Sequence, residues 1–221
     1  ARTLLRLIEP ISGQVLFEDR DITNLTGAPL QKLRREMQIV FQNPFSSLDP
    51  RMKIGDAVME PLRIHQIGKS DRERRDRAAY LLERVGLDPN FMKRYPHEFS
   101  GGQRQRVCIA RALALNPKFI ICDESVSALD VSVQAQVLNL LKEIQEEFGL
   151  TYIFISHDLS VVKFMSDRIM VMNRGKIEEI GLADIIYREP KQEYTRQLIN
   201  SIPTGSLARI QQRQQQRSIV M

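Results

Sequence analysis

The sequence predicts an α/β fold with a mainly parallel sheet, flanking helices and a long helical insertion. Three short, largely apolar runs suit buried strands of a parallel sheet, and polar residues follow each run: residues 38–41, 119–122 and 151–155. Helical patterns lie between the runs, and strands that alternate with helices are typical of parallel sheets. The stretch 53–115, between the first and second runs, is helical in pattern and predicts a separate lobe.

The composition fits a protein with one sizeable core. A chain of 221 residues can bury such a core in one domain, with a second lobe. No apolar run approaches the roughly 18–20 residues that span a bilayer, and no signal peptide opens the sequence. The net charge of +5 fits an anionic partner, such as a nucleotide or a membrane-adjacent surface, and does not require nucleic acid. Cys108 and Cys122 are expected to be core residues of a reducing compartment, without a disulfide or a metal.

The part of the chain before the helical stretch predicts four short elements. Residues 1–8 have the pattern of a helix interior, a short strand is expected over 13–17, and a basic helix over 30–37. The strand 38–41 then ends at Gln42. Taken alone, a glutamine at a strand end is usually just a polar terminus.

A polar turn with two glycines opens the last helix of the insertion. Its residues are Ser100, Gly101, Gly102 and Gln103. Ser100 is a natural N-cap, and Val107, Ala110 and Ala114 fall on one face of the helix that follows. Because glycine has no Cβ, backbone N–H groups at this helix start can approach an anion closely. A tight helix entry without any ligand would explain the same residues.

Two carboxylates follow the apolar run 119–122. Asp123 and Glu124 would lie at the C-terminal end of a buried parallel strand, where open α/β sheets bind ligands. One carboxylate can hold a magnesium ion, usually through water, while its neighbour activates an attacking water. An ordinary strand that ends in a polar turn is the alternative.

The last third of the chain predicts further elements of an α/β fold. A long amphipathic helix is expected after Asp130, with Gly149 as its C-cap, ahead of the strand 151–155. Two strands should follow, over residues 168–172 and 176–180, joined by a turn at 173–175. A helix is expected after them, over residues 193–199. The tail 204–221 is rich in Gln and Arg, and we expect it to be flexible.

Together, in this order and spacing, the glycine turn and the carboxylate pair resemble the signature motif and the Walker B motif of ATP-binding cassette (ABC) ATPases. The segment Ser127-Ala128-Leu129-Asp130 resembles the D-loop of that family. Gln42 matches its Q-loop glutamine, and His157 matches its switch histidine. The resemblance covers residues 1 to about 203, and it implies a P-loop NTPase (RecA-like) fold with an inserted helical subdomain.

The sequence departs from the family in one large respect. The Walker A pattern, G-x-x-x-x-G-K-S/T, occurs nowhere in the 221 residues. We therefore expect an N-terminally truncated cassette that lacks the first strands and the P-loop and is inactive by itself. Two smaller departures, Ser125 where proline is common and Phe99 where leucine is common, remove no catalytic group.

The resemblance implies a role for each matching residue. Glu124 would act as the base toward water, and His157 would contact the γ-phosphate. Gln42 and Asp123 would hold Mg²⁺. The residues expected to bind ATP are Gln42, Ser100, Gly101, Gly102, Gln103, Asp123 and Asp130. In the family, two such subunits sandwich two ATP molecules, and the signature helix of one subunit faces the Walker A loop of the other.

Two segments resemble the oligopeptide, dipeptide and nickel importer branch of the family: residues 43–51 (NPFSSLDPR) and 192–195 (QEYT). The implied function is ATP hydrolysis that powers the import of oligopeptides or dipeptides, at the cytoplasmic face of the inner membrane. The implied partners are ATP, transmembrane permease subunits and a second ATPase subunit, identical or different, with no nucleic acid. An importer of nickel or another small solute, a soluble ABC-type ATPase without a membrane partner, and a binding module without hydrolysis remain alternatives.

The resemblance also implies a division of the chain. Residues 1–42 and 116–180 would form the RecA-like core, 43–115 the Q-loop and helical signature subdomain, 181–203 a C-terminal helical extension, and 204–221 the flexible tail.

The loop after Gln42 is a candidate permease contact. We expect apolar contacts from Phe45, Leu48 and Met52, with Asp49 and Arg51 nearer the rim. The alternative is that Phe45 and Leu48 pack under the loop.

Overall fold

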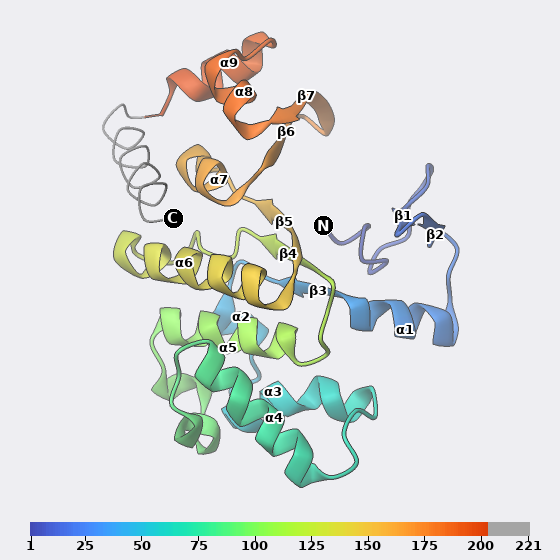
Figure 1. The fold of residues 1–221 in the computed structure, drawn as a ribbon, viewed down its shortest axis with the longest axis vertical. Helices are drawn as coiled ribbons and strands as arrows, with labels where there is room; N and C mark the ends of the chain where they lie inside the picture. The colour runs from blue at the N-terminus through green and yellow to red at the C-terminus, as the bar shows by residue number, and fades with distance from the viewer. Residues whose placement is uncertain (203–221) are drawn as a thin grey trace. The chain divides into compact units, whose positions relative to one another are not determined.

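Figure 1 shows the computed structural model, which describes residues 1–202 and divides the chain into two compact units. The first unit comprises residues 1–155, and the second begins at Ser156. The tail 204–221, for which flexibility is expected, lies outside the described residues. Within residues 1–202, no helix combines the length and the apolar character needed to cross a bilayer.

A parallel sheet of three strands forms the centre of the first unit. Its strands, in spatial order, are β3 (Met37–Val40), β4 (Phe119–Asp123) and β5 (Thr151–Ile155). The register pairs Val40 with Cys122, and Asp123 with Ile155, so the C-terminal ends of the strands lie at one edge. All three predicted strands are confirmed. The middle of β4 is buried, as its apolar run predicted, whereas most side chains of β5 are half-buried.

The predicted helices beside these strands are present. α6 (Val131–Phe148) follows its N-cap Asp130 and ends at Gly149, whose φ of +62° makes it the expected left-handed C-cap. α1 (Gly27–Glu36) is the basic helix expected over 30–37. It ends one residue earlier than expected because Met37 already belongs to β3.

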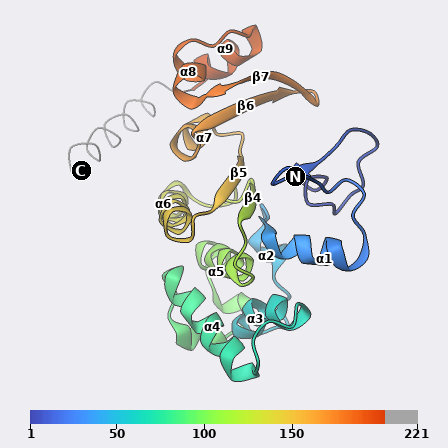
Figure 2. The same ribbon diagram turned by 45° about the vertical axis from the view of Figure 1, so that its right-hand side comes forward.

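Residues 44–113 form the helical lobe, which Figures 1 and 2 show as one group of helices. Its elements are α2 (Pro44–Ser47), α3 (Ile54–Ile64), α4 (Asp71–Arg84), the short 3-10 helices η1 (Pro89–Lys93) and η2 (Pro96–Glu98), and α5 (Gly101–Leu113). α3, α4 and α5 pack against one another, and Leu62, Leu81 and Ile109 are fully buried. Since burying each such side chain is worth about 1.5–3 kcal/mol, the lobe has an apolar core that supports α5.

The predicted helix over residues 1–8 is wrong, because this segment forms only turns. Arg6 has a φ of +53°, a left-handed backbone that interrupts a helix. Its guanidinium donates a hydrogen bond to the carbonyl oxygen of Thr23, and Arg34 donates to the carbonyl oxygen of Arg6 at 2.7 Å. Contacts with later parts of the chain thus hold this segment in a series of turns.

The expected strand over 13–17 is also shorter than predicted. Only β1 (Leu16–Phe17) forms, and it pairs antiparallel with β2 (Arg20–Asp21).

The second unit contains the predicted hairpin and the predicted helix after it. β6 (Arg168–Asn173) and β7 (Lys176–Leu182) pair antiparallel around Arg174 and Gly175, which both have positive φ, as hairpin turns favour. Three helices accompany them: α7 (Leu159–Met165), α8 (Ala183–Arg188) and α9 (Glu193–Asn200). Val162, Ile169 and Ile186 belong to the buried cluster that joins these elements.

Candidate functional site

Gln42 and Glu124 meet at the C-terminal edge of the central sheet. Gln42 lies two residues beyond β3, and Glu124 directly follows β4, the neighbouring strand. Although they are 82 positions apart in sequence, Nε2 of Gln42 donates a hydrogen bond to Oε2 of Glu124 at 2.7 Å. The parallel pairing of the two strands therefore joins two of the residues that the sequence singled out.

Ser127 completes this cluster, and the sequence suggested no role for its side chain. Nε2 of Gln42 also approaches Oγ of Ser127 at 3.3 Å, and that hydroxyl donates to the carbonyl oxygen of Glu124 at 2.9 Å. A serine three residues after a carboxylate at a strand end is the signal that could have found it, since serine hydroxyls readily bond nearby backbone groups.

The backbone of Glu124 has an unusual conformation. Its φ of +49° lies in the left-handed region, which residues other than glycine rarely adopt. Its N–H donates to the carbonyl oxygen of Ile155 at 3.0 Å, and its own carbonyl oxygen accepts from the N–H of Ser127 at 3.0 Å. These bonds hold the residue at the point where β4 ends and the chain turns.

Asp123, the last residue of β4, lies between the buried strand and the turn at Glu124. The preceding Cys122 is fully buried, and this burial raises the pKa of its thiol to about 12. The half-buried Asp123 therefore places its carboxylate where the apolar environment of the sheet gives way to solvent. This is the edge at which α/β sheets bind ligands.

Two residues at this edge, Gln42 and Asp123, could each offer one oxygen ligand to a magnesium ion. The amide nitrogen of Gln42 has two hydrogens, and it donates to Glu124 and to Ser127. Its Oε1 atom is then the group that Gln42 can offer to a cation, and Asp123 can offer a carboxylate at the end of the neighbouring strand. Among residues 1–202 no group of three or more His, Cys, Asp or Glu side chains could hold a metal. Mg²⁺ usually takes one or two protein oxygens, and completes its shell with water and phosphate.

The start of α5 has the predicted N-cap. Oγ of Ser100 accepts from the N–H of Gln103 at 3.3 Å, and Oε1 of Gln103 accepts from the N–H of Ser100 at 3.0 Å. This reciprocal capping box satisfies two backbone donors of the first turn. The N–H groups of Gly101 and Gly102 are consequently the ones that this helix start can present to an anion.

The two glycines have different surroundings. A Cβ atom on Gly102 would lie 2.3 Å from Cγ1 of Val133, whereas one on Gly101 would find Leu129 at 3.6 Å and Phe45 at 3.9 Å. Packing against α6 is thus sufficient to explain a glycine at position 102. Packing does not require one at position 101.

Asp130 has a structural bond as well as its predicted role. Its Oδ1 atom accepts from the N–H of Val133 at 3.0 Å and caps α6. The capped start of α6 and the start of α5 lie side by side, because Gly102 packs against Val133.

His157 belongs to the second unit, where it lies in a turn held by its two neighbours. The N–H of Asp158 donates to Oγ of Ser156 at 3.0 Å, and Oδ1 of Asp158 accepts from the N–H of Ser160 at 2.8 Å at the start of α7. The role of His157 stays a prediction.

The loop after Gln42 differs from the expectation at Leu48. Leu48 is only 3% exposed, so its predicted contact with a permease is wrong, and it packs under the loop. Phe45 is 57% exposed, and the guanidinium of Arg104 on α5 lies 4.1 Å from the centre of its ring. Nη1 of Arg111 donates to the carbonyl oxygen of Ser47 at 2.6 Å, so α5 contacts this loop twice.

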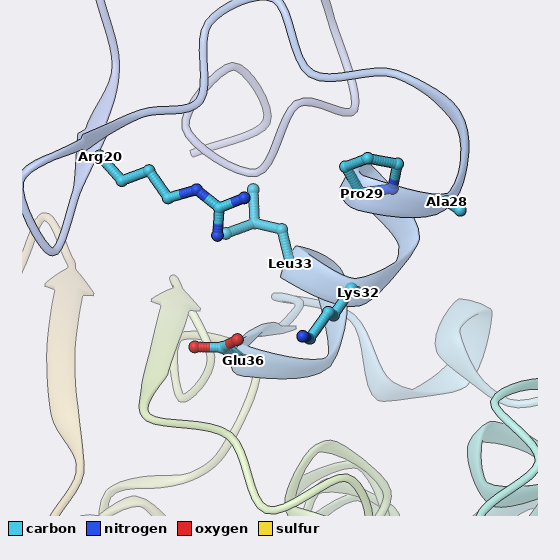
Figure 3. Close-up of a pocket in the computed structure, with 6 residues that line it drawn as sticks. All are labelled: Arg20, Ala28, Pro29, Lys32, Leu33 and Glu36. Atoms are coloured by element: carbon cyan, nitrogen blue, oxygen red, sulfur yellow. The ribbon is translucent and has the colours of Figure 1, made fainter.

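A separate pocket of about 310 Å³ lies beside α1 (Figure 3). It is lined by Arg20, Ala28, Pro29, Lys32, Leu33 and Glu36. Glu36 directly precedes β3, whereas Gln42 follows that strand, so the pocket and the Gln42–Glu124 pair lie at opposite ends of β3. The pocket is not part of the candidate site.

Curated proteins similar to this chain include ATP-binding proteins named for glutathione import. GsiA, the glutathione import ATP-binding protein of Pectobacterium atrosepticum, is 52% identical over 213 residues, which make up 96% of this chain and 34% of that protein. GsiA of Salmonella typhimurium is 53% identical over 208 residues, 94% of this chain and 33% of that protein. The chain thus spans about a third of the length of these relatives.

Solved structures show the same fold. The dimeric cassette MJ0796, in a post-hydrolysis state bound to ADP and Pi, superimposes with a TM-score of 0.71 at 34% identity, covering 82% of this chain and 78% of that one. CbiO1 of Clostridium perfringens, part of the ABC transporter complex cbiONQ, gives a TM-score of 0.75 at 28% identity, over 94% of this chain and 80% of that one. The family model described as "ABC transporter" matches residues 1–127. The chain therefore belongs to the ABC transporter family and has the fold of its ATPase cassettes.

Proposed function

We propose that this chain supplies the hydrolytic residues of an ABC importer subunit that uses ATP to import oligopeptides or dipeptides. The hydrogen bond between Gln42 and Glu124 carries the proposal, because it joins a candidate phosphate sensor to a candidate base at the ligand-binding edge of the sheet. The similarity to importers named for glutathione supports a short peptide as cargo.

Glu124 is the general base of the proposed reaction. Its carboxylate takes a proton from the water that attacks the γ-phosphate, and the amide of Gln42 holds that carboxylate in place. Hydrolysis of this kind depends mainly on positioning and on neutralising phosphate charge. Gln42, through Oε1, and Asp123 would hold Mg²⁺, which when bound supplies part of that neutralisation.

The remaining site residues act on the nucleotide. His157 contacts the γ-phosphate in this proposal. The signature residues Ser100, Gly101, Gly102 and Gln103 bind ATP at the start of α5, and Asp130 lies in the adjoining D-loop. Their support is the capping box and the two glycine N–H groups, which suit an anion at a helix start. The site would be composite, with the signature helix of one subunit facing the Walker A loop of a second ATPase subunit, identical or different.

The importer would also include transmembrane permease subunits, with this protein bound at the cytoplasmic face of the inner membrane. Phe45 is the best supported permease contact, because it is exposed on a loop that begins at the proposed site. In the proposed division of the chain, residues 1–42 and 116–180 form the core, 43–115 the signature lobe and 181–203 an extension. Two structural neighbours are described as a dimer and as part of a transporter complex, which supports this assembly.

The proposal is tested by replacing Glu124 with Gln in a form of the protein that has a Walker A loop. Because that pattern is absent from the 221 residues, we define the joined protein as this chain with the Walker A-bearing N-terminal strands of a related cassette placed before Ala1. A general base is worth about 10²–10⁴ in rate, so Glu124→Gln should lower kcat by that factor. The Kd for ATP should change little, since the amide keeps the shape of the side chain.

Glu146→Gln is the matched control, since Glu146 is an exposed residue of α6 and undergoes the same chemical change. Its kcat should equal that of the unmodified joined protein. A Glu124→Gln protein whose kcat stays within about threefold of the unmodified rate would show that Glu124 is not the base.

A further inference from the structure

Ser127 takes part in three hydrogen bonds, two with Glu124 and one with Gln42. Its N–H and its hydroxyl both donate to the carbonyl oxygen of Glu124, at 3.0 Å and 2.9 Å. The same hydroxyl accepts from Nε2 of Gln42 at 3.3 Å. One small side chain therefore contacts the backbone of the proposed base and the side chain that bonds its carboxylate.

The first pair of bonds fixes the backbone of Glu124. A left-handed conformation at a glutamate persists only where the surroundings hold it, and here φ is +49°. Ser127 holds the carbonyl side of the residue, and the carbonyl oxygen of Ile155 holds the N–H side at 3.0 Å. Because the peptide groups on both sides of Cα are held, the direction of the Cα–Cβ bond, from which the carboxylate extends, is fixed as well.

The third bond gives the amide group of Gln42 a second anchor beside its bond to the carboxylate. With one hydrogen of Nε2 on Ser127 and the other on Glu124, the nitrogen must point toward the base. Without the hydroxyl, Nε2 keeps only its bond to the carboxylate, so the amide is held by one hydrogen bond instead of two and can move more freely. The orientation that Ser127 helps to hold also leaves Oε1 for the cation.

We infer that Ser127 is a positioning residue for hydrolysis, which holds Glu124 and Gln42 in the arrangement that the reaction requires. The inference rests on the proposed function, since it assigns to Ser127 an effect that passes through Glu124. A merely structural serine would stabilise the turn, and its loss would lower the melting temperature without a specific effect on kcat.

The test compares Ser127→Ala and Ser127→Thr in the joined protein, with Ser166→Ala at the end of α7 as a matched control. Misplacing a catalytic group by about 1 Å can cost about 10²-fold in rate, so Ser127→Ala should lower kcat by about 10–100-fold. The KM for ATP should stay within about twofold, because Ser127 does not bind the nucleotide in this account. Ser127→Thr keeps the hydroxyl and should restore kcat to within about threefold of the unmodified rate.

The same alanine replacement in the Glu124→Gln background separates the inference from the proposed function. There, Ser127→Ala should lower the residual rate by less than about twofold, because no base remains to be positioned. If Glu124→Gln itself leaves kcat unchanged, the proposed function fails, whatever Ser127 does. Two outcomes would overturn the inference about Ser127 while Glu124→Gln is inactive. In one, Ser127→Ala alone leaves kcat unchanged; in the other, Ser127→Ala lowers kcat by the same factor with and without Glu124→Gln.

Circular dichroism melting gives the control for folding. If Ser127→Ala does not fold, Ser127→Thr tests the inference instead, and its kcat should stay near the unmodified rate. A folded Ser127→Thr protein that is more than about tenfold slower would overturn the inference.

Discussion

Replacing Gly102 with alanine should destabilise the protein, although alanine favours helices. The added Cβ atom would lie 2.3 Å from Cγ1 of Val133, a distance that requires α5 or α6 to move. Overpacking a filled site costs about 1–3 kcal/mol, and alanine gains up to about 1 kcal/mol over glycine in a helix. Because 2.3 Å is a severe clash, we expect a cost in the upper half of that range, about 2–3 kcal/mol, and a net loss of about 1–2 kcal/mol in the free energy of unfolding.

Gly101 provides the matched control in the same helical turn. An added Cβ atom there would lie 3.6 Å from Leu129 and 3.9 Å from Phe45, which are ordinary contact distances. Neither glycine has a positive φ, so the backbone strains neither replacement. Gly101→Ala should thus be neutral, or stabilising by up to about 1 kcal/mol.

Urea unfolding followed by circular dichroism measures both effects, and a double-mutant cycle with Val133→Ala assigns the cause. Removing Cγ1 of Val133 makes room for the new methyl group, so Gly102→Ala should become close to neutral in that background. The expected coupling energy is about 1–2 kcal/mol. If Gly102→Ala is as stable as the unmodified protein, or equally destabilising in both backgrounds, the packing argument is refuted.

Three other predictions concern burial. Burial raises the pKa of Cys108 to about 11 and of Cys122 to about 12. Both thiols should therefore resist thiol reagents at about pH 8 until the protein unfolds. Rapid labelling of the native protein would contradict this prediction. Burial lowers the pKa of His65, so the unfolded chain binds more protons, and stability should fall as the pH drops below about 6.5. The free energy of unfolding of His65→Gln should fall less steeply with pH. If urea unfolding gives the same pH dependence for both proteins, His65 is not the group responsible. Leu48→Ser should lower the melting temperature, because Leu48 is buried. Phe45→Ser should keep the melting temperature but lose co-purification with the permease, because Phe45 is exposed. The reverse pattern would show that the two residues were assigned wrongly.

Periodicity predicted the elements whose packing is local. Residues 131–148 have the apolar spacing of a helix and a glycine directly after it, and both features appear as expected in α6. The strands β3, β4 and β5 were predictable for a similar reason, since apolar runs that precede polar residues suit parallel strands.

The first residues could not be predicted in this way, because distant contacts decide their conformation. The apolar pattern of residues 1–8 is typical of a helix, yet the left-handed Arg6 bonds Thr23 and receives a bond from Arg34. Both partners lie more than fifteen positions away in the sequence. Leu48 shows the same limit, since a loop sequence alone does not tell which side chain turns inward.

The sequence was sufficient to predict which residues belong to the candidate site, but not the hydrogen bonds between them. The resemblance to ABC ATPases assigned Gln42 and Glu124 to one nucleotide site, and the parallel pairing of β3 and β4 brings the two side chains together. No pattern predicted the left-handed Glu124 or the hydroxyl of Ser127 that holds it, since both depend on how the chain turns after β4.

If Gln42, Asp123 and Glu124 form one metal-assisted hydrolytic site, as we propose, the position of the bound metal is the sharpest test of that site. Mn²⁺ can replace Mg²⁺ in crystals of the joined protein that carries Glu124→Gln and contains ATP, and its anomalous scattering marks its position. We expect the anomalous peak of Mn²⁺ at the C-terminal ends of β3 and β4. Oε1 of Gln42 should be a ligand, and Asp123 should bind the ion directly or through one water. A peak that lies away from these residues, or one ligated by residue 124, would contradict the account.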